Sequence, residues 1–375
     1  GMLPHIRPQM LDVFFSKNGN TDKNITEFGG RIDSAYKGFL PTGETAIFIL
    51  AGDDIEKRFI YSQLFETDHF FAQHNILKLE DVQANAPYIS GFISIAKEVM
   101  DLITTGIVRV PHFGIDFPAR NIETAMEWKD LVLDSDVMGQ VLEIKTWIEF
   151  GDKLLYDYGL GKKIKPGYRS LFYGPSGTGK TLTATLLGKI TGHDVFRIDL
   201  SLVISKYIGE TEKNLEKVFQ KADKRRWILF FDEADALFGK RTNISDAHDR
   251  FANQEVSYLL QRVEDYTGVV ILASNMKSNL DEAFTRRFQS IIYFPMPKKR
   301  ERYSLWKDAF SEKTKLEEKV SLSEIAEKYE LSGGSIVNVI RYSTLMALKH
   351  NRKVITLNDI QTGLRREFQK EGKTF

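Results

Sequence analysis

The 375-residue sequence contains no cysteine, which excludes disulfide bonds and thiolate metal sites. It has no apolar run near the roughly 20 residues that a membrane-spanning helix needs. Its N-terminus also lacks the basic-then-apolar pattern of a signal peptide. The sequence also has no excess of charge of either sign, because 52 basic residues balance 51 acidic ones. These absences predict a cytoplasmic protein with no membrane partner, and they give no support to a nucleic-acid partner.

The pattern of apolar residues divides the chain into three regions. We predict a mostly helical N-terminal domain for partner or substrate recognition over residues 1–120, an α/β core over 121–297 and a C-terminal helical subdomain over 298–375. Within the first region, apolar spacing of helical type is clearest between Ile89 and Ile103. No internal repeat and no low-complexity segment interrupts this organisation.

Short β-rich runs alternate with amphipathic helical stretches through the central region. Such alternation predicts a parallel sheet with helices on both faces. The predicted strands are Ser170–Tyr173, Val195–Asp199, Trp227–Asp232, Val269–Ser274 and Ile291–Phe294. The predicted fold class is therefore α/β, with a parallel five-stranded sheet at its centre.

The segment after the first predicted strand matches the phosphate-binding pattern G-x-x-x-x-G-K-[ST]. The expected nucleotide-binding residues are Gly174, Pro175, Ser176, Gly177, Thr178, Gly179, Lys180, Thr181 and Leu182. The glycines let backbone N–H groups point inward, and a helix starting at Gly179 adds its positive end to the pocket. Lys180 would reach the β and γ phosphates, and the Thr181 hydroxyl would hold Mg²⁺. A flexible glycine turn is the alternative, but the flanking strand and helix favour a nucleotide site.

Two carboxylates follow the apolar run Ile228-Leu229-Phe230-Phe231. In a parallel sheet the carboxyl ends of the strands share one edge, so Asp232 and Glu233 are expected beside the phosphate loop. Asp232 is predicted to bind Mg²⁺, directly or through water, and Glu233 to orient and polarise the attacking water. Acidic residues are also common at ordinary strand ends, but their pairing with the phosphate loop favours the catalytic interpretation.

Together with further motifs, these residues make the chain resemble the AAA+ ATPases, and within them the AAA subfamily, over about residues 127–375. The motifs are GPSGTGKT, LFFDEADALF, Asn275 at the end of a strand, and the run from Asp281 to Phe288. The resemblance implies a P-loop NTPase fold with a helical lid, ATP and Mg²⁺ as cofactors, and ATP hydrolysis. It also implies a homo-oligomeric ring, which has six subunits in most members, acting on a protein substrate.

The resemblance assigns further roles to individual residues. Asn275 would help to position the hydrolytic water, and Arg286 and Arg287 would reach the γ-phosphate bound by the neighbouring subunit. Many members have Pro-Gly between the two arginines and this chain does not, so the separate roles of the two arginines stay open. Tyr207 lies where the family carries its central pore loop and would grip the polypeptide, although an aromatic beside an aliphatic residue can also be core.

Three more positions follow from the same resemblance. Leu131 and Val132 lie where the family has its adenine-contacting linker, and Gly334 lies at the start of a helix where small residues let the backbone approach the nucleotide. No arginine occurs between Ser332 and Ile340, which is a departure from other AAA+ clades and fits the AAA subfamily.

Three functions from different classes are compatible with these motifs. The first is a ring motor that remodels, unfolds or disassembles a protein; the second is an ATP-dependent assembly switch that recruits a partner without threading. A nucleic-acid motor is the third, suggested by Asp232-Glu233-Ala234-Asp235. Such motors need a second domain of similar size, and the 81 residues from 295 to 375 that follow the last predicted strand are of helical pattern, so we do not favour this function. The chain also resembles bacterial single-ring AAA proteins, some of which are encoded with contractile injection systems.

Overall fold

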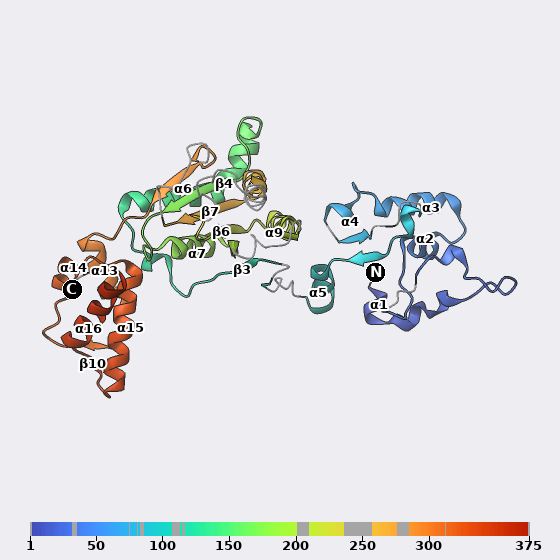
Figure 1. The fold of residues 1–375 in the computed structure, drawn as a ribbon. Coiled ribbons are helices and arrows are strands. Elements are labelled where there is room, and N and C mark those ends of the chain that lie inside the picture. Colours follow the sequence, from blue (N-terminus) through green and yellow to red (C-terminus); the bar gives the residue numbers. More distant parts are fainter. Residues whose placement is uncertain are drawn as a thin grey trace, which may run out of the picture. The chain divides into compact units, whose positions relative to one another are not determined.

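We analysed a computed structural model of the chain (Figure 1). The residues it describes are 2–31, 36–74, 76–80, 82, 86–106, 113–114, 117–200, 210–235, 257–275, 285–311 and 313–373. The chain forms two compact units, Gly1–Pro111 and His112–Phe375. The predicted boundary at residue 120 falls inside a strand of the second unit. Among the described residues, no helix combines the length and apolarity needed to span a membrane.

The first unit consists of short elements. They are α1 (Leu3–Ile6), η1 (Pro8–Phe15), η2 (Thr26–Phe28), α2 (Gly43–Ala51), α3 (Ile55–Ser62), η3 (Gln63–Phe65), α4 (Phe70–Gln73), β1 (Leu77–Leu79), η4 (Tyr88–Ser90), β2 (Ile93–Ile95) and α5 (Lys97–Thr105). Phenylalanine rings pack in its interior, with Phe28 and Phe48 centroids 4.9 Å apart and Phe14 and Phe39 centroids 5.4 Å apart.

The stretch between Ile89 and Ile103, whose apolar spacing is of helical type, is only partly α-helical. This stretch is divided into η4, β2 and α5, and β2 pairs antiparallel with β1. Long-range hydrogen bonds hold the break, because the carbonyl of Gly91 accepts from Gly43 N at 3.1 Å and that of Phe92 accepts from Glu80 N at 2.9 Å. The apolar spacing of a strand followed by a helix resembled that of one helix, and only the tertiary pairing separates them.

The second unit is built on a six-stranded sheet with the order β3-β5-β6-β7-β4-β8. Its strands are β3 (Ala119–Asn121), β4 (Tyr168–Tyr173), β5 (Val195–Ile198), β6 (Ile228–Phe231), β7 (Val269–Ser274) and β8 (Ser290–Tyr293). The five predicted strands are present and parallel to one another. The predicted strand number was one too low, because the short antiparallel edge strand β3 pairs with β5 and has no apolar run to reveal it.

Helices cover both faces of this sheet, as predicted. On one face α6 (Ser135–Asp152) and α7 (Lys180–Thr191) pack against Phe172 and Phe230. On the other, α9 (Glu210–Arg225) and the helical residues 257–265 pack against Leu171 and Phe231. Adjacent strand residues point to opposite faces of the sheet, and β6 and β7 are buried on both faces, so their sequences are continuous apolar runs. Figure 1 shows α7 and α9 beside the strands.

Helical connections and a lid subdomain complete the second unit. The connections are η5 (Trp128–Asp130), the π-helical turn η6 (Lys153–Asp157) and η7 (Leu160–Lys162). The lid contains α13 (Lys299–Ala309), β9 (Lys315–Leu316), α14 (Leu322–Lys328), α15 (Gly333–Lys349), β10 (Val354–Ile355) and α16 (Leu357–Lys370). Its core surrounds the fully buried Trp306 and includes Ile336 and Leu364.

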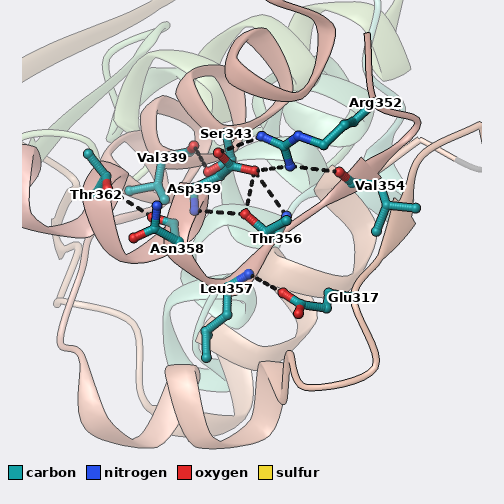
Figure 2. Close-up of polar contacts among 10 residues, drawn as sticks. All are labelled: Glu317, Val339, Ser343, Arg352, Val354, Thr356, Leu357, Asn358, Asp359 and Thr362. Carbon is teal, nitrogen blue, oxygen red and sulfur yellow. Dashed lines mark hydrogen bonds and ion pairs between the residues drawn. The ribbon is translucent and has the colours of Figure 1, made fainter. Parts of the chain in front are cut away.

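A polar cluster fastens the start of α16 to the rest of the lid (Figure 2). Arg352 donates from Nη1 and Nη2 to the two carboxylate oxygens of Asp359 at 2.8 and 3.1 Å. Thr356 adds a backbone N–H at 3.0 Å and a hydroxyl at 2.7 Å to the same carboxylate. The hydrogen bonds from Arg352, followed by those from Thr356, outweigh burial and lower the pKa of Asp359 to about 2.

This cluster makes lid stability depend on pH. Because the folded pKa of Asp359 lies below its unfolded value of 3.8, the stabilisation is present above that value and is lost as pH falls toward about 2. We expect Asp359→Asn to lower the free energy of unfolding by about 2 kcal/mol at pH 7. The deficit should shrink as pH falls through this window. Denaturant titrations followed by circular dichroism measure both effects.

A surface pair in the same subdomain supplies the control. Glu371 pairs with Lys373 at 2.7 Å near the chain end, and exposed pairs of this kind contribute little. Glu371→Gln should therefore leave the free energy of unfolding almost unchanged. Equal losses in the two variants, or a deficit in Asp359→Asn that does not change with pH, would contradict the assignment.

Candidate active site

The loop between β4 and α7 is shaped by its glycines. Gly174 and Gly177 adopt φ values of +144° and +76°, which residues other than glycine rarely adopt. A Cβ at Gly174 would lie 2.2 Å from the carbonyl oxygen of Phe294. The loop closes through the Thr178 hydroxyl, which donates to the Pro175 carbonyl at 2.8 Å. Gly179 then leads into α7, so the positive end of that helix faces the loop.

Lys180 lies at the centre of this loop with little exposure to solvent. Its Nζ donates to the carbonyl oxygens of Gly174 and Pro175 at 2.7 and 2.9 Å, and to Asn275 Oδ1 at 3.2 Å. Burial lowers the pKa of Lys180, while the nearby carboxylates of Asp232 and Asp235 oppose that shift. The ammonium group is thus held where the ends of β4 and β7 meet.

The carboxylates after β6 lie at the same edge of the sheet. Asp232 pairs with Arg197 of β5 at 3.4 Å between Oδ2 and Nη2, and its Oδ1 accepts from the backbone N–H of Glu233 at 3.0 Å. Glu233 has a φ of +51°, a left-handed conformation that costs about 1 kcal/mol or more in a residue with a Cβ. The Glu233 residue is exposed, whereas Asp232 is half-buried.

A cavity of about 620 Å³ brings the predicted residues together. Predicted residues that line it are Ser176, Gly177, Thr178, Gly179, Lys180, Thr181, Leu182, Leu131, Val132, Asp232, Glu233, Asn275 and Gly334. Gly174 and Pro175 do not line it and act through their carbonyls on Lys180. The lining residues that the sequence did not reveal include Leu133, Asp134, Phe294, Leu305, Val337 and Asn338, none of which belongs to a motif.

The lid reaches this cavity through the start of α15. Gly334 N donates to the Gly177 carbonyl at 3.0 Å, so the lid is bonded directly to the phosphate loop. A Cβ at Gly334 would come within 3.2 Å of Gly177 Cα, closer than most side chains accept. The Gly-Gly pair at this helix start therefore permits the close approach of two backbones.

The residues of the cavity fit a nucleotide with a magnesium ion. The Thr181 hydroxyl and the Asp232 carboxylate are hard oxygen ligands, which Mg²⁺ prefers. Loop N–H groups and Lys180 supply positive charge for phosphates. Apolar side chains such as Leu131, which is 7% exposed, border the remaining space and suit a flat base.

Other predicted residues lie away from this cavity or outside the described residues. Arg286 and Arg287 are exposed and do not line the cavity, and Arg287 pairs with Glu264 at 2.8 Å. Tyr207, predicted in a pore loop, lies outside the described residues. No sequence motif predicted a role for Arg197, the partner of Asp232, or for Asp235, which accepts hydrogen bonds from the end of β7. Asp235 lies in the acidic motif, which could have drawn attention to it.

Comparison with known proteins agrees with this geometry. Residues 170–296 match the family described as "ATPase family associated with various cellular activities (AAA)". The chain is 34% identical over 216 residues to a cell division cycle protein 48 homolog of Archaeoglobus fulgidus, covering 56% of this chain and 28% of that protein. It is 33% identical over 215 residues to the proteasome-activating nucleotidase of the same organism, covering 55% of this chain and 54% of that protein.

A third relative is the uncharacterized AAA family ATPase y4kL of Sinorhizobium fredii, 33% identical over 193 residues, covering 51% of this chain and 56% of that protein. The chain thus spans between 28% and 56% of the length of these three relatives. The similarity to ATPases of contractile injection systems stays a prediction, whereas the predicted AAA resemblance is confirmed. A phosphate loop and an acidic strand end share one cavity with a helical lid, and residues 170–296 thus form an AAA ATPase domain.

Proposed function

We propose that this chain is an ATP-hydrolysing ring motor that remodels, unfolds or disassembles a protein partner. The observation that carries the hydrolytic part is the convergence on one cavity of the Lys180 ammonium group, the two carboxylates after β6 and Asn275. Lys180 begins α7, the carboxylates follow the end of β6 and Asn275 follows the end of β7. Positive charge, metal-ligating oxygen and a base are the components that phosphoryl transfer to water requires.

Each side chain has a distinct part in this proposal. Lys180 binds the β and γ phosphates, and the loop N–H groups hold the phosphate chain in line. A magnesium ion held by Thr181 and Asp232 would neutralise charge on the phosphate oxygens. Glu233 orients the attacking water and accepts its proton, while Asn275 hydrogen-bonds that water from the neighbouring strand. Leu131, Val132 and Gly334 border the base and sugar.

We assign Arg286 and Arg287 to the neighbouring subunit's site. Both are exposed and absent from the cavity of their own chain, as expected for groups that act across an interface. A ring of identical subunits presents the same interface at every junction, and six subunits is the number we propose. Each γ-phosphate would then meet arginines from the next subunit, and hydrolysis would depend on assembly.

The partner of the motor is proposed to be a protein. One relative is named a proteasome-activating nucleotidase, a name that itself points to work on a protein assembly. We assign the gripping role to Tyr207, because stacked aromatic rings contact a polypeptide without regard to its sequence. The N-terminal unit, Gly1–Pro111, is the proposed site of partner recognition.

Phosphate release from ATP tests the hydrolytic proposal. The purified chain should release phosphate in the presence of Mg²⁺ and lose this activity when the ion is chelated. Turnover per subunit should rise with protein concentration, since each site is completed by a neighbour. Absence of Mg²⁺-dependent release at all concentrations from nanomolar to tens of micromolar would refute the proposal.

A further inference from the structure

Asp235 connects the turn after β6 to the end of β7. Its Oδ1 accepts a hydrogen bond from the Ser274 hydroxyl, and its Oδ2 accepts from the backbone N–H of Asn275 at 3.2 Å. Ser274 is buried, with 1% of its surface exposed. One residue earlier, Ala234 N donates to the Ala273 carbonyl at 2.8 Å. Two successive residues of the turn therefore fasten the last residues of the neighbouring strand.

The ladder between β6 and β7 explains why a side chain is needed here. The pairing of the two strands ends at Phe231 and Leu272, while β7 continues to Ser274. Beyond that point the chain of β6 has turned through the left-handed Glu233 and no longer offers regular backbone partners. The Asp235 carboxylate supplies an acceptor to the Asn275 N–H at the position where the ladder has stopped.

Asn275 is in turn joined to the phosphate loop. Its Oδ1 accepts from Lys180 Nζ at 3.2 Å, so a continuous chain of hydrogen bonds runs from Lys180 through Asn275 to Asp235. Glu233 lies two residues before Asp235 on the same turn. A shift at Asp235 would therefore change the distance between the Glu233 carboxylate and the Asn275 amide, which both face the cavity.

We infer that Asp235 is a positioning residue for hydrolysis, which sets the Asn275 amide relative to Glu233 by holding the end of β7. This inference rests on the proposed ATPase function and assigns a task to a residue outside the cavity lining. Asp235 touches neither the phosphates nor the water in this assignment. Its loss should slow the chemical step and leave nucleotide binding, which depends on the loop and Lys180, nearly intact.

A second carboxylate offers a matched control at the opposite end of β7. Asp223 Oδ1 accepts from the backbone N–H and the hydroxyl of Thr267 at 3.4 and 3.0 Å, two residues before β7 begins. It makes the same kind of contact with the same strand but lies at the edge away from the cavity. Asp223→Ala therefore removes one backbone and one hydroxyl hydrogen bond next to β7, as Asp235→Ala does, but at the end of the strand away from the cavity.

The test compares Asp235→Ala, Asp235→Asn and Asp223→Ala in the full chain. We expect Asp235→Ala to lower kcat about 10–100-fold, as loss of a supporting partner does. The affinity for ATP, measured by titration with a fluorescent analogue, should change less than about threefold. Asp235→Asn should be intermediate, because an amide oxygen still accepts from Ser274 while its NH₂ cannot accept from Asn275. Asp223→Ala should keep the wild-type kcat.

Hydrogen exchange at Asn275 gives a readout that does not need turnover. Asp235→Ala and Asp235→Asn should speed exchange of the Asn275 amide, and Asp223→Ala should not. If the wild-type chain does not hydrolyse ATP, the proposed function is refuted. If the exchange rate of the Asn275 amide is unchanged in both Asp235 variants, only the inference about Asp235 is refuted. Equal kcat values in Asp235→Ala and Asp223→Ala, or parallel losses of kcat and ATP affinity, would also overturn it. If Asp235→Ala does not fold, Asp235→Asn decides by the same criteria.

Discussion

Replacing Glu233 with glutamine is expected to lower ATP hydrolysis about 10²–10⁴-fold, the usual contribution of a positioned general base. Glutamine keeps the shape of the side chain but cannot accept the proton of the attacking water. ATP binding should persist, because Lys180, the loop and Asp232 are unchanged. Phosphate release measures hydrolysis, and the nucleotide that stays with the protein through gel filtration measures binding. A protein partner that stays bound to this variant in ATP would be the target of the ring.

A surface glutamate provides the control for this variant. Glu149 pairs with Lys145 on α6 at 2.8 Å, and Glu149→Gln should retain wild-type turnover. Hydrolysis within a few fold of wild type in Glu233→Gln would contradict the assigned base. The same variant separates a motor from an assembly switch, since a switch locked with ATP stays active on its partner and a motor stalls.

Alanine at both Arg286 and Arg287 is expected to lower hydrolysis about 10³–10⁵-fold, as loss of an arginine finger does. These side chains do not line the cavity of their own chain, so the sharpest test is complementation. The double arginine variant is mixed with Glu233→Gln, each inactive alone. A site with an intact Glu233 beside a neighbour with intact arginines regains activity, and about a quarter of the sites in equal random mixtures have this arrangement.

Complementation distinguishes action across the interface from action within one chain. If the arginines served their own site, mixtures of the two variants would stay inactive at every ratio. A second adjacent pair, Arg225 and Arg226, lies at the opposite edge of the sheet, where Arg226 pairs with Asp152 at 2.6 Å. Alanine at both of these removes the same charge and should leave hydrolysis near wild type.

Local sequence was sufficient to predict those parts of the structure in which a residue's conformation depends on its neighbours in the chain. The runs that form β4 to β8 are rich in apolar residues, so the parallel sheet could be predicted to within two residues at each strand end. The phosphate loop could be predicted because glycine is the residue that readily adopts φ values such as the +144° of Gly174, whatever its distant neighbours are. By contrast, β3 and the division of residues 89–103 into η4, β2 and α5 depend on hydrogen-bond partners outside those segments.

The sequence by itself determined the α/β class, the loop of residues 174–181 and the carboxylates of Asp232 and Glu233, because each depends on short-range pattern and backbone conformation. The tertiary structure alone decided that Gly334 bonds to Gly177, that Arg197 meets Asp232 and that Asp235 holds Asn275. These contacts join residues that are between 35 and 157 positions apart. No local pattern encodes such a pairing, since it arises only when the strands align their carboxyl ends at one edge and the lid closes on that edge.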